Sequence, residues 1–210
     1  VVAIQMTGRF ITIEGGEGVG KSTNIQCITD RLQSAGIEFV LTREPGGTQF
    51  AEQIRSLLLS HQDEPVAEMT ELLLIFAARA QHIKQVIAPA LDAGKWVVCD
   101  RFTDATYAYQ GGGRGLNVEA IEQLETLVQG SLRPHMTFLL DLPPEIGLER
   151  ASKRAALDRF ELEKLEFFNK VRASYLQRAH NEPQRCVIIN AEASIEAVQA
   201  DILSHLEPLL

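Results

Sequence analysis

Five short apolar runs alternate with longer segments of helical character along the chain. The runs are rich in β-branched residues and show almost none of the polar alternation of a strand with one solvent face. They cover Phe10–Glu14, Glu38–Thr42, Lys95–Asp100, Met136–Leu142 and Cys186–Asn190. Strands buried on both faces are typical of parallel sheets, so the pattern predicts a five-stranded parallel sheet.

The segments between the runs predict helices on both faces of that sheet. Thr48, Asn117 and Ser194 stand where helix N-caps are expected, and Gly36 and Gly94 stand where helices end before a strand. The predicted helices lie near 21–35, 48–60, 68–93, 103–110, 117–129, 144–153, 161–180 and 194–207. An α/β arrangement of this kind binds its ligands at the carboxyl ends of the strands.

Length and composition favour a single domain, 1–210, that works in the cytoplasm. A chain of 210 residues buries a full core without disulfides, and its three cysteines show no metal or redox spacing. The net charge of −8 argues against nucleic-acid binding. No apolar run reaches transmembrane length and no leader opens the chain, so we expect no membrane partner. Residues 1–5 precede Met6, the expected natural start, and are given no role.

The loop between the first strand and the first helix matches the phosphate-binding pattern G-x-x-x-x-G-K-[ST] at every fixed position. Its backbone N–H groups and the helix N-terminus are expected to hold the phosphates of a nucleoside triphosphate, with Lys21 on the β- and γ-oxygens and the Ser22 hydroxyl on Mg²⁺. The nucleotide-binding residues predicted by this pattern are Gly15, Gly16, Glu17, Gly18, Val19, Gly20, Lys21 and Ser22.

Two further strands end in residues that suit phosphate chemistry. Asp100 follows the third strand, where a carboxylate that orients Mg²⁺ is usual beside a phosphate loop. Arg101 comes next and can contact a phosphate with two N–H groups. The alternatives are a helix cap for Asp100 and an ion pair between the two. Asp141, which ends the fourth strand, is a second candidate for the metal carboxylate, although the prolines after it favour a role at the start of a helix.

Five motifs occur in the order and spacing of the bacterial thymidylate kinase family, which this chain resembles from Met6 onward. The resemblance implies a P-loop nucleoside monophosphate kinase fold with a small mobile lid. It also implies transfer of a phosphoryl group from ATP·Mg²⁺ to dTMP in dTTP biosynthesis, by a cytosolic homodimer, and a cis Glu44–Pro45 peptide bond. The motifs are Gly15–Ser22, Thr42–Thr48, Asp100–Phe102, Tyr109–Gly115 and Leu157–Glu161.

The resemblance also assigns the acceptor site, residue by residue. It places the dTMP phosphate on Arg55 and Arg101, and the deoxyribose hydroxyl on Glu17. For the base it implies stacking on Phe76, a hydrogen bond from Arg79, and further contacts from Thr106 and Gln110. Phe76 and Arg79, three apart, share a helix face. From composition alone, core packing is the first reading of Phe76, and a buried ion pair is the alternative for Arg79.

Some members of the family that this chain resembles carry a catalytic arginine in the phosphate loop, and others supply it from the lid. The phosphate loop here contains none, so the chain resembles the lid-arginine type, with the lid at about 150–161. The lid segment concentrates four cations among small residues, namely Arg150, Lys153, Arg154 and Arg159. The side chains of such a charged run usually lie on the solvent-exposed surface of a protein. We expect Arg154, with Arg159 second, to meet the charge of the transferred phosphoryl group beside Lys21, Asp100 and Arg101.

Two other functions fit the phosphate loop. One is a kinase with a different acceptor, either another nucleoside monophosphate or a deoxynucleoside; two acceptor-phosphate arginines favour a monophosphate. The other is a nucleotide-dependent switch protein. A guanine-reading Asn-Lys-x-Asp motif, expected of a GTPase switch, does not occur in the sequence.

Overall fold

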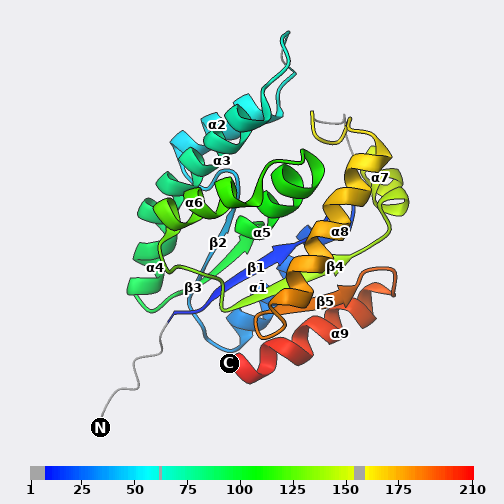
Figure 1. Ribbon diagram of the computed structural model, residues 1–210. Coiled ribbons are helices and arrows are strands. Elements are labelled where there is room, and N and C mark those ends of the chain that lie inside the picture. Colours follow the sequence, from blue (N-terminus) through cyan, green and yellow to red (C-terminus); the bar gives the residue numbers. More distant parts are fainter. Residues whose placement is uncertain (1–7, 62, 154–158) are drawn as a thin grey trace.

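The five predicted strands form one parallel sheet in the order β2-β3-β1-β4-β5 (Figure 1). The computed structural model describes residues 8–61, 63–153 and 159–210. Every neighbouring pair runs parallel, so the carboxyl ends of all five strands meet at one edge. The strands are β1 (Phe10–Glu14), β2 (Phe39–Arg43), β3 (Trp96–Asp100), β4 (Met136–Asp141) and β5 (Cys186–Asn190).

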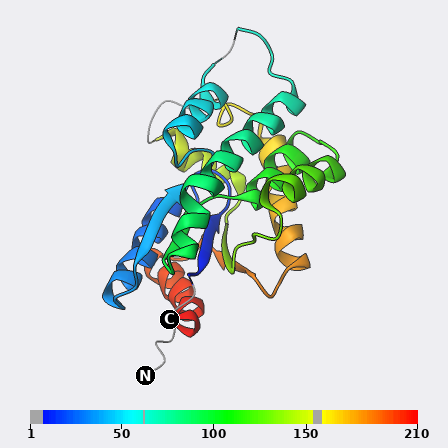
Figure 2. The ribbon, with the colours of Figure 1, turned by 90° about the vertical axis from the view of Figure 1, so that its left-hand side faces the viewer.

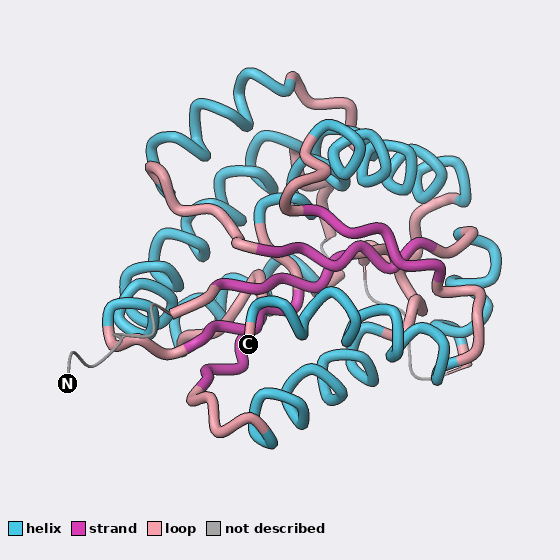
Figure 3. The backbone as a smooth tube through the Cα atoms, turned by 90° about the horizontal axis from the view of Figure 1, so that it is seen from below, coloured by secondary structure: helices cyan, strands magenta, loops and turns pink. Residues whose placement is uncertain are grey.

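Helices cover both faces of the sheet, which lies between them in Figure 3. On one face α1 and α9 pack over β1, β3 and β5 in the largest apolar cluster. On the other face, α4 packs on β3 and α8 on β4 and β5. The helices are α1 (Lys21–Ser34), α2 (Gln49–Leu59), α3 (Glu68–His82), α4 (Ala88–Asp92), α5 (Thr103–Thr106), α6 (Val118–Gln129), α7 (Pro144–Ser152), α8 (Leu165–Asn181) and α9 (Ile195–Leu206).

The predicted element ends are confirmed where local chemistry sets them. The side chains of Thr48, Asn117 and Ser194 each accept a hydrogen bond from a backbone N–H in the first helical turn. Gly36 and Gly94 adopt positive φ angles after α1 and α4. The Glu44–Pro45 peptide bond is cis, as the family resemblance predicts. No helix within the described residues combines the length and apolar character needed to cross a membrane.

The helix predicted over 68–93 is instead interrupted. Residues Ile83–Ile87 form a π-helical segment, η1, between α3 and α4. Pro89 follows this segment at the start of α4. Because Pro89 has no N–H to donate to the carbonyl four residues earlier, the regular helix cannot continue through it, and the chain forms a wider turn.

A second π-helical segment, η2 (Tyr107–Gly113), continues α5 beyond the predicted end at residue 110. Its glycines pack closely against α8. A Cβ atom on Gly112 would lie 2.6 Å from the Cβ of Ser174, and one on Gly113 would lie 2.4 Å from the Phe167 ring. The glycines therefore permit α8 to approach the backbone of η2, which carries two residues of the site described next.

Helix α8 begins at Leu165 rather than near residue 161, where the sequence pattern predicts its start. Residues 159–163 form turns instead. Their side chains explain the difference, because Arg159 and Glu163 make ion pairs with residues of α3 and of the loop after η2. The short helix η3 (Glu207–Leu209) ends the chain.

Candidate active site

The phosphate loop joins β1 to α1 at the carboxyl edge of the sheet. Gly15, Gly18 and Gly20 take positive φ angles, which bend the backbone into a loop over the N-terminus of α1. No acidic residue occupies the first turn of that helix, so its positive end is left for an anion. The Lys21 ammonium donates to the carbonyls of Gly15 and Gly16, at 3.4 and 3.1 Å.

A left-handed turn at Arg101 directs the end of β3 toward this loop. Among the described residues, Arg101 is the only non-glycine with a positive φ, 68°. Two hydrogen bonds hold the turn against β1. The Arg101 N–H donates to the Ile13 carbonyl at 2.9 Å, and the Phe102 N–H donates to the Glu14 carboxyl at 2.6 Å. Backbone conformations of this kind persist where the surroundings enforce them, and they concentrate at functional sites.

Glu17, inside the phosphate loop, is the acidic partner of Arg101. Its carboxylate accepts hydrogen bonds from the Arg101 guanidinium at 2.7 Å and from the Tyr109 hydroxyl at 2.8 Å. Burial alone would raise the pKa of Glu17, but the charges of Arg101 and Lys21 and these hydrogen bonds lower it to about 2. Glu17 is therefore an anion at neutral pH, placed to accept a hydrogen bond from a ligand hydroxyl.

Asp100 has a carboxylate oxygen suited to a metal or its waters. Its Oδ1 is buried and has no hydrogen-bond partner among the described residues. The Asp100 charge acts on the nearby Lys21. Within the described part of the chain no group of three or more His, Cys, Asp or Glu side chains gathers as a metal site. A cation here would take one or two protein oxygens and complete its shell with phosphate oxygens and water, as Mg²⁺ does in kinases.

A cavity of about 120 Å³ extends from Glu17 toward α3 and η2. One part of its wall carries Arg55 and Arg101. Arg55 donates to the Pro45 carbonyl at 3.0 Å, and burial with the nearby charges of Arg43 and Arg101 lowers its pKa. The lining residues are Glu17, Glu44, Pro45, Arg55, Leu58, Leu59, Ile75, Arg79, Arg101, Phe102, Ala105, Thr106, Tyr109, Gln110 and Phe160.

Arg79 lines this cavity and has one hydrogen-bond donor without a partner among the described residues. Its Nε donates to Glu44 at 2.7 Å, and its Nη2 donates to the Thr106 hydroxyl at 2.9 Å. Nη1 is buried and has no partner within the described residues. An unpaired buried donor costs about 1–3 kcal/mol, which an acceptor on a ligand would recover.

The structure places Phe76, predicted to stack on the base, in the core instead of the cavity wall. The ring is buried in a cluster with Leu72, Tyr107 and Ile121 and does not line the cavity. Ile75 lines it instead. Because Ile75 precedes Arg79 by four residues, the two side chains lie along one face of α3. Phe76 therefore packs in the core, which is the role that composition alone favours for it.

Two of the predicted lid cations, Lys153 and Arg159, form ion pairs with acids of α7 and α3. Arg154 lies outside the described residues. Lys153 forms an exposed ion pair with Glu149 at 2.7 Å. Arg159, contrary to its assignment as a catalytic cation, donates to the Leu58 carbonyl and to Glu71 at 2.8 and 2.6 Å. The buried Glu71 carboxylate therefore neutralises Arg159 away from the phosphate loop.

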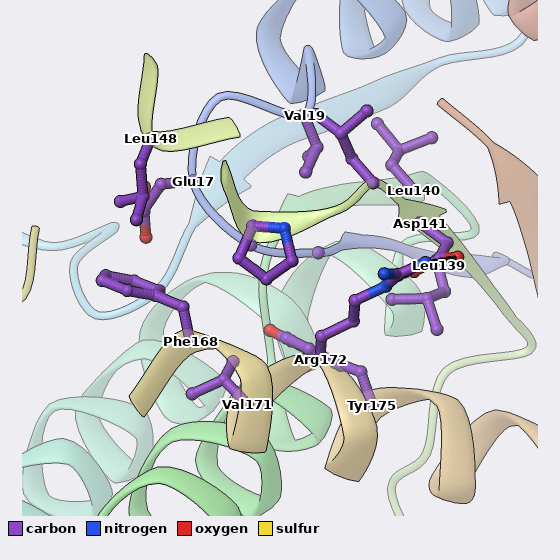
Figure 4. Close-up of a pocket in the computed structure, with 14 residues that line it drawn as sticks. Glu17, Val19, Leu139, Leu140, Asp141, Leu148, Phe168, Val171, Arg172 and Tyr175 are labelled. Carbon is purple, nitrogen blue, oxygen red and sulfur yellow. Dashed lines mark hydrogen bonds and ion pairs between the residues drawn. The ribbon is translucent and has the colours of Figure 1, made fainter. Parts of the chain in front are cut away.

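The alternative metal carboxylate, Asp141, has a partner of its own. It forms two hydrogen bonds with Arg172 of α8, at 2.7 and 2.9 Å. Both residues line a smaller cavity of about 20 Å³ between the phosphate loop, α7 and α8, in which Figure 4 shows Arg172 lying against Asp141. The ion pair makes Asp141 a structural residue and leaves Asp100 as the metal candidate.

Sequence reasoning missed four buried polar residues that hold the site. Glu14 fixes the Arg101 turn, Glu44 and His82 lie behind Arg79, and Glu71 lies behind Gln110. One signal was available. Glu71, Ile75 and Arg79 are spaced by four along an apolar helix, so they form a stripe with charges at both ends.

The fold and the site together define a P-loop nucleotide kinase. They combine a parallel sheet, a phosphate loop, a strand-end aspartate and a cavity lined by arginines. Residues 13–202 match the model of the thymidylate kinase family. A thymidylate kinase of Ectopseudomonas mendocina is 60% identical over 205 residues, covering 98% of each chain, and one of Pseudomonas putida is 61% identical over 197 residues, 94% of each. The crystal structure of the Ehrlichia chaffeensis thymidylate kinase is 34% identical, with a TM-score of 0.77, over 95% of this chain and 98% of that one. This chain belongs to the thymidylate kinase family.

The buried Glu14 predicts how stability changes with pH. Burial and the charge of Asp104 raise the pKa of Glu14 to about 8, against 4.5 for an ordinary glutamate. The folded protein therefore keeps a proton on Glu14 that the unfolded chain releases above pH 4.5. This makes the free energy of unfolding fall as the pH rises from about 4.5 to 8 and stay level above that.

We expect Glu14→Gln to reduce the fall in Tm between pH 5 and pH 8, because the neutral amide has no proton to lose. Thermal melts of both proteins across this range measure the effect. Glu122→Gln, which removes a charge from the exposed face of α6, is the control and should keep the wild-type slope. Parallel curves for wild type and Glu14→Gln would mean that Glu14 is already ionised in the folded protein.

Proposed function

We propose that this protein transfers the γ-phosphoryl group of ATP to dTMP, giving ADP and dTDP for dTTP synthesis. One observation carries the proposal: a single cavity is lined both by arginines that can bind a phosphate and by an arginine with an unpaired donor for a base. Arg55 and Arg101 supply the first, and Arg79 supplies the second. The cavity also contains Glu17 of the phosphate loop, which joins the acceptor site to the donor site.

On the donor side, the loop N–H groups and Lys21 bind the triphosphate of ATP. When bound, Mg²⁺ neutralises charge on the β- and γ-phosphates, and Ser22 and Asp100 are the residues that would hold it. The unpaired Oδ1 of Asp100 supports that role. Because phosphoryl transfer spreads negative charge over the equatorial oxygens, positioned cations lower the barrier without a covalent intermediate.

On the acceptor side, Arg55 and Arg101 hold the dTMP phosphate in line with the γ-phosphate, and Glu17 accepts from the deoxyribose hydroxyl. Arg79 donates to the thymine edge, with Thr106 and Gln110 beside it. Ile75 takes the place that was predicted for Phe76 and supplies an apolar contact to the base. These roles are supported by the shared cavity and by the spacing of Ile75 and Arg79 along α3.

The decisive experiment is release of ADP from ATP with and without acceptor. ADP should form at a substantial rate only when dTMP is present. Release that depends on another nucleotide or on a deoxynucleoside would identify a kinase with a different acceptor. Slow release that no acceptor stimulates would indicate a nucleotide-dependent switch.

Arg79→Ala tests recognition of the base. Loss of a charged hydrogen bond costs about 2–3 kcal/mol, so we expect KM for dTMP to rise by roughly 30- to 150-fold while KM for ATP changes little. Steady-state kinetics with each substrate varied in turn measures both constants. Arg133→Ala, which removes a half-exposed arginine paired with Glu125, should leave both constants near wild type. Equal increases in the two KM values would show that Arg79 is structural.

Arg154 remains the predicted catalytic cation of the lid, since Arg159 is held by Glu71. A residue that acts only in the transition state should, when removed, lower kcat and kcat/KM together. We expect Arg154→Ala to lower both by at least about tenfold without weakening ATP binding. Lys153→Ala, beside it in the sequence, should have little effect. If Arg154→Ala keeps the wild-type kcat, another cation supplies the charge.

We also propose that the protein is a cytoplasmic homodimer, as the family resemblance implies. Helices α2, α3 and α6 pack side by side (Figure 2) and expose large apolar side chains. Apolar side chains gathered on a protein surface mark interaction sites. The exposed residues on these helices include Phe50, Met69, Leu73, Val118 and Leu127.

A further inference from the structure

Glu71 is a buried carboxylate that receives hydrogen bonds from three different side chains. It lies in the first turn of α3 and is only 1% exposed. Gln110 Nε2 donates to its Oε1 at 2.8 Å, and Arg159 Nη2 donates to its Oε2 at 2.6 Å. Arg114 lies between them, with contacts of 3.3 and 3.4 Å to the two oxygens.

The charges of this cluster balance without Gln110. Arg114 also pairs with Glu163, so two arginines face two carboxylates. Burying a carboxylate is costly unless it is paired, and the arginines satisfy that requirement. The hydrogen bond from Gln110 is therefore additional to what the buried charge needs.

That additional bond determines which end of the Gln110 amide faces Glu71. A carboxylate oxygen accepts hydrogen bonds and donates none, so it selects the NH₂ end of the amide. The carbonyl oxygen of Gln110 is then directed away from Glu71, and no described residue donates to it. Because Gln110 lines the larger cavity, this acceptor is available to a ligand there.

We infer that Glu71 is a positioning residue that makes the site accept thymine and reject cytosine. The inference rests on the proposed function. With the amide fixed, the cavity offers a donor on Arg79 and an acceptor on Gln110. Thymine presents the complementary pair, the O4 acceptor and the N3–H donor. Cytosine presents an N4 amino donor and an N3 acceptor, the opposite order.

Glu71→Gln should weaken this discrimination, because an amide side chain can also donate. The oxygen of the new amide would accept from Arg159, the shorter and charged contact. Its NH₂ group would then face Gln110 and favour the reversed amide, with the Gln110 NH₂ toward the cavity. In that arrangement the N3–H of thymine no longer meets an acceptor on Gln110, whereas the N3 of cytosine meets a donor there.

The test compares kcat/KM for dTMP and for dCMP in the full-length enzyme. We expect Glu71→Gln to raise the dCMP/dTMP ratio by at least about tenfold, the effect of one re-paired buried hydrogen bond. Glu71→Asp keeps the charge but withdraws the carboxylate from Gln110, and should raise the ratio by less. Glu163→Gln is the matched control: it removes a carboxylate from Arg114 without touching Gln110, and should leave the ratio within about threefold of wild type.

Thermal melts show which variants fold, and every folded variant gives a ratio. An unchanged ratio in Glu71→Gln and Glu71→Asp, or a rise of the same size in Glu163→Gln, would overturn the inference and make Glu71 a structural residue. A wild-type enzyme without dTMP-dependent ADP release would instead contradict the proposed function. The two failures are thus distinguishable.

Discussion

The left-handed turn at Arg101 is the constraint on which the arrangement of the site depends. A parallel sheet brings the ends of β1 and β3 together, but a normal strand end would not point the Arg101 guanidinium at the phosphate loop. Two hydrogen bonds to β1, from the N–H groups of Arg101 and Phe102, enforce the unusual backbone. The turn lets Arg101 reach Glu17 of the phosphate loop, which links the two halves of the proposed site.

Buried acids then fix the directions of the residues that face the cavity. Glu14 holds the turn, Glu44 accepts from Arg79, and Glu71 accepts from Gln110. A long side chain loses rotamer freedom when it binds a ligand, and a partner behind it reduces that loss. Glu44 and Glu71 also leave their partners with one group each that is unpaired among the described residues: Nη1 on Arg79 and the carbonyl oxygen on Gln110.

The π-helical segment η2 places two residues that donate hydrogen bonds to acids of the site. In η2 the wider turn carries Tyr109 onto Glu17 and Gln110 onto Glu71, two residues that adjoin in sequence but contact different parts of the site. Departures of this kind from regular helix are frequent at functional sites. The glycines that follow let α8 support the segment from behind.

The sheet, the phosphate loop and the strand-end residues were all predictable from the amino-acid sequence. Apolar runs predict the strands because burial on both faces excludes polar side chains. The phosphate-loop pattern is local as well, because its glycines and Lys21 are the residues that a phosphate-binding backbone turn requires. The N-caps at Thr48, Asn117 and Ser194 were predictable for the same reason, since a cap bonds to the turn that follows it.

The neighbour that each side chain contacts could not be predicted in the same way, because it depends on the packing of distant segments. Periodicity shows that α3 buries one face, but both Ile75 and Phe76 satisfy it, and only packing against Tyr107 and Ile121 turns the ring away from the cavity. In the sequence, Arg159 is one of several cations in a charged run. In the structure it donates to Glu71, 88 residues earlier, which neutralises its charge. Contacts between distant segments depend on how the helices pack on the sheet, and local sequence does not contain that information.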